Sequence, residues 1–158
     1  MNRRTAIQSL AAVSWAPLSL GGYAEATEYA SAAEVFAAVD RLEAEVGLRF
    51  RALAESGAGA KALATSVLSD HERHRRARAK VRQRLLLPAS EPALVEAPDL
   101  ASLEALRSVQ QALVHAHAEG LVALRDPGAV QVMAAHMVEL SRHLTVIDLW
   151  IESEASRG

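Results

Sequence analysis

Apolar side chains recur every three or four residues along four stretches of the chain, with polar and charged side chains between them. In the clearest stretch, six apolar residues lie four, three, four, four and three positions apart, which is the periodicity of one face of an α-helix. These six are Val35, Val39, Leu42, Val46, Phe50 and Leu53. Similar patterns farther along predict four helices in total, over residues 31–56, 60–86, 100–125 and 128–153.

The connections between these helices differ in length. Residues 56–59 (Ser-Gly-Ala-Gly) and residues 126–128 (Asp-Pro-Gly) form short breaks, which predict antiparallel neighbours on either side of each break. Asp126 suits the N-cap of the last helix, as Asp99 suits that of the third. Residues 88–98 contain three of the five prolines and could extend about 40 Å, the length of such a bundle.

The sequence therefore predicts an all-α, ferritin-like four-helix bundle, in which a long Pro-rich crossover joins two antiparallel helical hairpins. An up-and-down bundle is the alternative, because a long linker permits a crossover without requiring one. The length of 158 residues suits one domain, and the 51% of apolar residues with only 4% of aromatic residues favours helices over sheet.

Composition also excludes several kinds of chemistry. The chain has no cysteine, which removes disulfides, thiolate metal sites and covalent haem attachment. Its formal net charge of −2 gives no basic field for nucleic acid. Neither a Gly-rich phosphate-binding loop nor a serine nucleophile motif is present in the sequence.

The first 26 residues have the organisation of a secretory signal. Arg3-Arg4 precede a short apolar segment that ends near Leu20, and Ala24-Glu25-Ala26 offers a cleavage site. The paired arginines resemble a twin-arginine signal, whose pathway exports folded proteins. The apolar segment is too short and too interrupted to form a good membrane span. We expect a signal peptide over residues 1–26, a bundle over residues 27–158, and a periplasmic location.

Polar side chains fall on the apolar faces of all four predicted helices. His74 lies seven residues from both Val67 and Val81, and Glu43 lies seven residues from both Phe36 and Phe50. Burying unpaired carboxylates and imidazoles costs several kcal/mol. A bound metal ion would satisfy them, and this mixture of ligands suits iron, manganese, zinc or copper. The predicted ligands are Glu43, Asp70, His74, His117, Glu139 and His143, with His71 and His136 as alternates or as hydrogen-bond partners that orient the ligands.

The second and fourth helices carry a weak internal repeat. Asp70-His71-Glu72-Arg73-His74 and Glu139-Leu140-Ser141-Arg142-His143 both read acid-x-x-Arg-His. In each copy the acid and the histidine are four residues apart and share one helix face. The Glu-x-x-His spacing of di-metal carboxylate bundles is absent, because Arg142 stands where that motif has histidine.

Two other interpretations of the polar core remain open. The carboxylates and imidazoles could form a hydrogen-bonded network without metal in an exported accessory or interaction protein. Alternatively, His74, His117 or His143 could ligate a b-type haem together with Met133 or Met137.

A basic face on the second predicted helix is a candidate surface for binding a protein partner. Arg73, Arg76, Lys80 and Arg84 follow one another at spacings of three and four residues. Such a face is either solvated and paired with acids of the first helix, or a docking surface for a protein partner. The sequence leaves the oligomeric state open.

Residues 61–64 (Lys-Ala-Leu-Ala), followed by Ser69-Asp70-His71, are similar to the second-helix segment of small periplasmic four-helix families. The chain thus resembles exported bacterial ferritin-like proteins of poorly defined function, over residues 30–153 in layout and over some ten residues in motif. The resemblance implies a four-helix bundle with a metal centre between the helices. Because polar groups converge from all four helices, the leading hypothesis is that the bundle binds a transition metal for storage, buffering or redox protection. The ligand regions that the resemblance implies contain Glu43, Asp70, His74, His117, Glu139 and His143.

Overall fold

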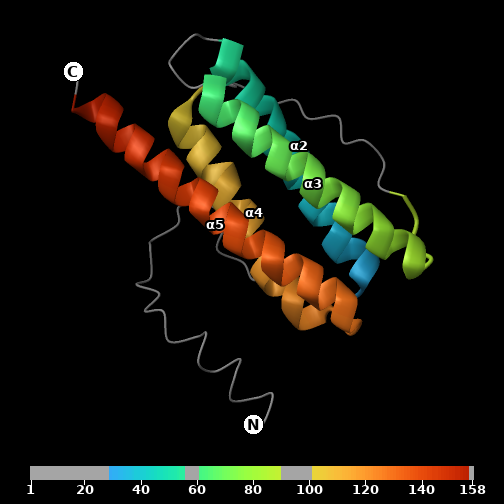
Figure 1. Cartoon of the computed structure of the whole chain (residues 1–158). Coiled ribbons are helices and arrows are strands. Elements are labelled where there is room, and N and C mark those ends of the chain that lie inside the picture. The colour runs from blue at the N-terminus through green and yellow to red at the C-terminus, as the bar shows by residue number, and fades with distance from the viewer. Residues whose placement is uncertain (1–28, 56–60, 90–100, 157–158) are drawn as a thin grey trace.

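The computed structural model describes residues 29–55, 61–89 and 101–156, and within them it contains four helices and no strand. The helices are α2 (Ala32–Glu55), α3 (Lys61–Arg84), α4 (Leu103–Ala123) and α5 (Pro127–Ala155), packed side by side (Figure 1). The all-α four-helix fold predicted from the sequence is confirmed. The predicted signal peptide and most of the Pro-rich linker lie outside the described residues.

Side-chain caps set where the second pair of helices begins. Asp126 accepts a hydrogen bond from the backbone N–H of Ala129 and is the predicted N-cap, and Pro127 occupies the first turn of α5, one residue before the predicted start. Helix α4 begins three residues later than predicted, because the hydroxyl of Ser102 accepts a hydrogen bond from the backbone N–H of Ala105. Asp99, the cap expected from the sequence, lies outside the described residues.

The helix directions follow from contacts between helix ends. Arg84 at the end of α3 forms an ion pair with Asp126 at the start of α5, so these two helices run antiparallel. Gly120 near the end of α4 faces Val35 near the start of α2, so α2 and α4 are antiparallel as well. Helices α3 and α4 are therefore parallel, so the end of α3 and the start of α4 lie at opposite ends of the bundle (Figure 1). This is the predicted crossover arrangement, and the up-and-down alternative is excluded.

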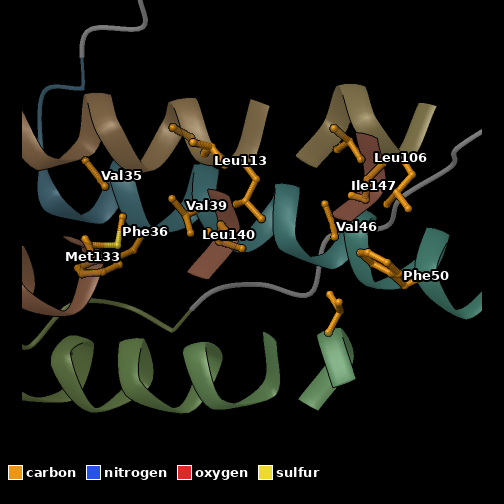
Figure 2. Close-up of a cluster of buried hydrophobic side chains, with 14 of the residues drawn as sticks. Val35, Phe36, Val39, Val46, Phe50, Leu106, Leu113, Met133, Leu140 and Ile147 are labelled. Carbon is orange, nitrogen blue, oxygen red and sulfur yellow. The ribbon is translucent and has the colours of Figure 1, made fainter. Parts of the chain in front are cut away.

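Large apolar side chains from α2, α4 and α5 meet in the interior (Figure 2). They include Val35, Phe36, Val39, Val46, Phe50, Leu106, Leu113, Met133, Leu140 and Ile147. Helix α3 contributes only Ala64, Val67 and Val81 to the buried apolar set, and otherwise buries histidine and arginine. The core is thus apolar on three sides and polar along α3, which places the polar site between α3 and the other helices.

None of the helices in the described part of the chain is both long enough and apolar enough to cross a membrane.

Candidate metal centre

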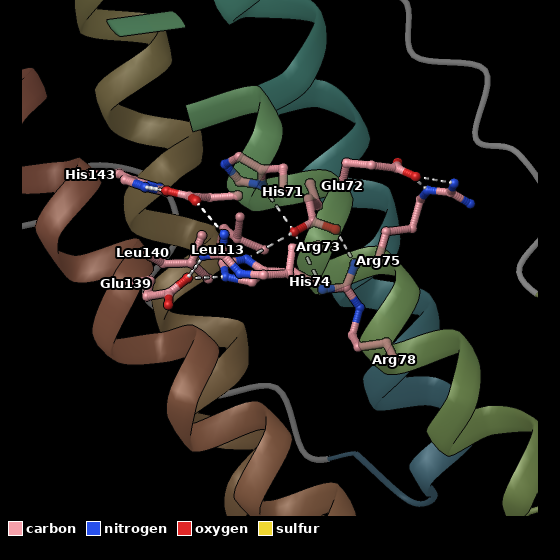
Figure 3. Close-up of polar contacts among 12 residues, drawn as sticks. His71, Glu72, Arg73, His74, Arg75, Arg78, Leu113, Glu139, Leu140 and His143 are labelled. Atoms are coloured by element: carbon pink, nitrogen blue, oxygen red, sulfur yellow. Dashed lines mark hydrogen bonds and ion pairs between the residues drawn. The ribbon is translucent and has the colours of Figure 1, made fainter. Parts of the chain in front are cut away.

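The buried face of α3 is a stripe of charged and titratable residues. His71, His74 and Arg78 lie three and four positions apart, so the helix directs all three side chains toward the interior, where they are buried. Each of them contacts a carboxylate on a neighbouring helix. Figure 3 shows these side chains projecting from α3 toward the helices that pack against it.

Glu43 of α2 joins the two histidines in one compact group. His71 Nδ1 lies 2.9 Å from Glu43 Oε1, and His74 Nδ1 lies 3.6 Å from the same oxygen. One ligand atom from each residue lies within 4.8 Å of the other two, and all three residues are buried. Ligand bonds of about 2.0–2.2 Å place two ligands of one ion about 3.0–3.5 Å apart. The group could therefore hold a metal ion with little rearrangement.

Arg78 holds the opposite side of the Glu43 carboxylate. Its guanidinium donates to both Glu43 oxygens, and its Nε donates to Asp40 Oδ1 at 2.8 Å. Burial alone would raise the pKa of Glu43, but the imidazoles of His71 and His74 and the charge of Arg78 outweigh it and hold that pKa far below its usual range. Glu43 is therefore ionised and acts only as an acceptor, so the hydrogen bond from His71 is donated by Nδ1–H.

The two copies of the sequence repeat pair with each other. His74 Nε2–H donates to Glu139 at 2.6 Å, and His143 Nε2–H donates to Asp70 at 3.0 Å. Arg73 links the two acids, with nitrogens 2.8 Å from Asp70 and 2.6 Å from Glu139. On each of the antiparallel helices α3 and α5, the histidine of the repeat thus donates a hydrogen bond to the acid of the repeat on the other helix.

Two further histidines extend the cluster toward α4 and α5. His117 Nδ1–H donates to the carbonyl of Leu113 at 2.9 Å, and burial lowers its pKa to about 4. His136 stacks on His74 with ring centroids 4.0 Å apart, and burial lowers its pKa to about 3. Burial also lowers the pKa of His143. These three imidazoles are neutral at pH 7 and retain a lone pair.

Each of the five buried histidines keeps one ring nitrogen that has no hydrogen-bond partner among the described residues. These nitrogens are His71 Nε2, His74 Nδ1, His117 Nε2, His136 Nδ1 and His143 Nδ1. A buried polar atom left without a partner costs about 1–3 kcal/mol. In four of the five rings, the other nitrogen donates to an oxygen. Metal-binding histidines have the same arrangement, with one nitrogen on the ion and the other oriented by a carboxylate or a carbonyl.

Of the six predicted ligand residues, only Glu43 and His74 belong to the compact group found among the described residues, and the structure places the other four around it. Glu43 contacts both His71 and His74, His74 pairs with Glu139, Asp70 pairs with His143, and the ring of His117 lies 6.2 Å from that of His136. His71, an alternate in the sequence prediction, belongs to the compact group with Glu43 and His74.

Sequence reasoning missed four buried polar residues, which are Arg49, Arg78, Arg82 and Gln110. Arg78 lies four residues after His74 on the same helix face, and this spacing was the available signal. Gln110 is buried in α4 and donates to the carbonyl of Leu140 at 3.0 Å. Arg78 matters most for the site, because it shares Glu43 with the two histidines.

The basic face of α3 is paired differently from the expectation. Arg73 contacts Asp70 and Glu139, and Arg76 contacts Glu72 at 2.8 Å, so neither uses an acid of the first helix. Ion pairs with that helix come instead from Arg78 and from Arg82, which lies 3.2 Å from Asp40. The helix phase brings residues 78 and 82 toward α2, whereas residues 73 and 76 lie exposed.

Comparison of the chain with protein-family models, with curated proteins and with solved structures gives no match. Function is therefore inferred from the geometry and chemistry of the cluster.

Proposed function

We propose that the protein binds one transition-metal ion through Glu43, His71 and His74. The observation that carries this proposal is the compactness of the group, whose three ligand atoms lie within 4.8 Å of one another in the interior. A supporting observation is that His74 donates its Nε2–H to Glu139, which leaves Nδ1 directed toward Glu43 with a free lone pair.

The kind of ion follows from the donors. Two imidazoles and one carboxylate suit iron, manganese, zinc or copper and do not suit calcium or magnesium, which prefer oxygen ligands. Three protein ligands leave positions open for water or for a small molecule, as in catalytic zinc sites.

The charges favour a single ion over a pair. The cluster contains the acids Asp40, Glu43, Asp70 and Glu139 against the arginines Arg73, Arg78 and Arg82. With neutral imidazoles the sum is −1, which one divalent ion changes to +1, whereas two divalent ions would leave +3 in a largely buried site. The buried residues of α4 include Gln110 and His117 but no carboxylate, unlike the di-metal bundles.

We propose further that the protein is exported to the periplasm, with residues 1–26 as a twin-arginine signal, and that it buffers or stores its metal there. The support is the paired arginines, the apolar segment and the Ala-x-Ala site. A pathway that exports folded proteins would allow the ion to be loaded before export.

The experiment is metal analysis of untagged protein, expressed with its own N-terminal residues and purified from the periplasmic fraction. Mass spectrometry would give the bound metal. Titration of the chelator-treated protein with Zn²⁺, Cu²⁺, Fe²⁺ and Mn²⁺ would give stoichiometry and affinity, and Co²⁺ absorption would report imidazole coordination. We expect close to one ion per chain.

The matched variants are His71→Gln at the centre and His115→Gln on the exposed surface of α4. We expect at least a tenfold loss of affinity for His71→Gln and no change for His115→Gln, with helix content checked by circular dichroism. Folded wild-type protein that takes up none of these ions would refute the metal centre and favour the metal-free polar network. Absence of the protein from the periplasmic fraction would refute export.

A further inference from the structure

A cavity of about 750 Å³ lies between α2 and α3 and reaches the candidate metal centre. Glu43 and His71, two residues of the metal-binding group, form part of its wall. Exposed side chains of the same two helices, including Arg51 and Arg75, line it as well, so the cavity opens to solvent. Its volume is in the range of sites that bind small molecules, about 300–1,000 Å³.

The charged lining has more positive than negative side chains. It consists of Arg51, Arg75, Arg78, Arg82, Asp40, Glu43 and Glu72, together with His71. Each carboxylate is already paired with an arginine of the same lining: Asp40 and Glu43 with Arg78, and Glu72 with Arg75. The acids are therefore neutralised in place, and the excess charge of the wall is positive.

Two of these arginines retain unused hydrogen-bond donors. Arg51 makes no hydrogen bond or ion pair with any residue that the structure describes, and its guanidinium lies beside Gly47, 3.7 Å from the position of an added Cβ. Arg82 is only 7% exposed, and its Nε has no hydrogen-bond partner within the described ranges. A guanidinium with free N–H groups matches the planar oxygens of a carboxylate and the oxygens of a phosphate.

The rest of the wall is apolar. Ala44, Leu68, Ala79 and Leu87 line the cavity between the charged groups. A ligand that fits both parts of this wall needs an anionic head for the guanidinium groups and an apolar body for the alanine and leucine side chains. Inorganic phosphate would satisfy only the first part.

We propose that this cavity binds a small organic oxyanion, a carboxylate or a phosphate ester with an apolar body, held by Arg51 and Arg82. The anion would lie against Glu43 and His71, next to the open positions of the bound ion. The position of the anion beside a metal ion rests on the proposed metal centre. The binding of the anion to the two arginines does not depend on that proposal.

The test uses the chelator-treated full chain and four probes: benzoate, phenyl phosphate, inorganic phosphate and the neutral analogue benzamide. Isothermal titration calorimetry, supported by NMR shifts of residues around the cavity, would give the affinities. We expect saturable 1:1 binding of benzoate or phenyl phosphate, at least tenfold tighter than benzamide and inorganic phosphate. The tighter of the two organic anions identifies the head group.

Arg51→Gln is the diagnostic variant, because Arg51 is exposed and its loss leaves the packing intact. Arg76→Gln is the matched control, since Arg76 is an exposed arginine of α3 outside the cavity lining. We expect about a tenfold loss of anion affinity in Arg51→Gln and no change in Arg76→Gln. Equal losses in both variants would show general charge attraction and overturn the proposal, as would equal binding of benzoate and benzamide or the absence of saturable binding.

The metal and the anion proposals fail separately in this design. Anion binding in the presence of chelator would support the anion site even if the protein binds no metal ion. Metal uptake would support the metal centre even if the protein binds no anion. Repeating the titration with the metal-loaded chain tests the contact between the two ligands. Tighter binding of the anion to the loaded chain is expected, and unchanged affinity would overturn the placement beside the ion.

Discussion

Replacing Arg78 with methionine tests how deeply the charges of the site are buried. The substitution keeps an apolar chain in place but removes the guanidinium that contacts Glu43 and Asp40. The Arg78 side chain is 1% exposed and that of Glu43 is 6% exposed, so the remaining carboxylate would have little access to water. Two unit charges about 4 Å apart attract by about 4 kcal/mol at an effective dielectric constant of about 20. Breaking a buried pair costs about 3–5 kcal/mol.

We therefore expect Arg78→Met to lower the free energy of unfolding by about 3–5 kcal/mol at neutral pH in the presence of chelator. Urea denaturation, followed by circular dichroism at the helical minimum, measures this change. The control is Arg76→Met, which removes the ion pair between Arg76 and Glu72 on the same helix. The two charged groups of this pair lie 2.8 Å apart, and their side chains are 73% and 40% exposed. Exposed pairs contribute about 0.2–1 kcal/mol, so the control should lose less than about 1 kcal/mol.

A second variant keeps the test decisive if Arg78→Met is unfolded without urea. Glu43→Gln combined with Arg78→Met removes both charges and should recover most of the lost stability, because no ionised carboxylate is left in the interior. Equal losses for Arg78→Met and Arg76→Met would refute the reasoning. So would a double variant that is less stable than the Arg78→Met variant alone.

Two further predictions concern packing and pH. Gly47→Ala should stabilise the protein to urea by about 1 kcal/mol, because glycine disfavours a helix interior and the new Cβ meets its neighbours at 3.7–3.8 Å. Gly120→Ala should destabilise it, since its Cβ would lie 2.5 Å from Cγ1 of the buried Val35; stabilisation by both substitutions would contradict this packing. Burial lowers the pKa of His117 in the folded protein from the ordinary 6.5 to about 4. Its contribution to stability is therefore complete above about pH 6.5 and is lost as the pH falls from there toward about 4. Within that window the metal-free protein should lose up to about 1.4 kcal/mol per pH unit through this group, and a His117→Gln variant with an equally steep pH dependence would contradict the assignment.

Local patterns were sufficient to predict the helices. Of the six apolar residues that predict the first helix, five are buried in α2 and Leu42 is partly buried, because a 3.6-residue period fixes which side chains share a face. The order of the helices in space needed more than local patterns. A long linker is compatible with two topologies, and only contacts between distant segments, such as Arg84 with Asp126, distinguish them.

The periodicity of the helices also determined which part of the site could be predicted. Periodicity placed His74, His117 and His143 inside the bundle, and the structure agrees. Arg78 lies on the same face of α3 as His74, but a charged residue is assigned to solvent unless its partner is known. That partner is Glu43, 35 residues earlier on another helix, and no pattern within α3 contains this information.

The paired repeat indicates that the acids of the site have two different roles, metal ligation and the orientation of imidazole rings. Because α3 and α5 are antiparallel, an acid four residues before a histidine on each helix is brought opposite the histidine of the other. Asp70 and Glu139 then receive the N–H of His143 and His74, and their side chains are 26% and 35% exposed. Glu43, at 6% exposed, is the acid that shares the interior with two imidazole nitrogens. An ion in this interior would take Glu43 as its carboxylate ligand, while Asp70 and Glu139 at the solvent boundary fix the orientation of the imidazoles.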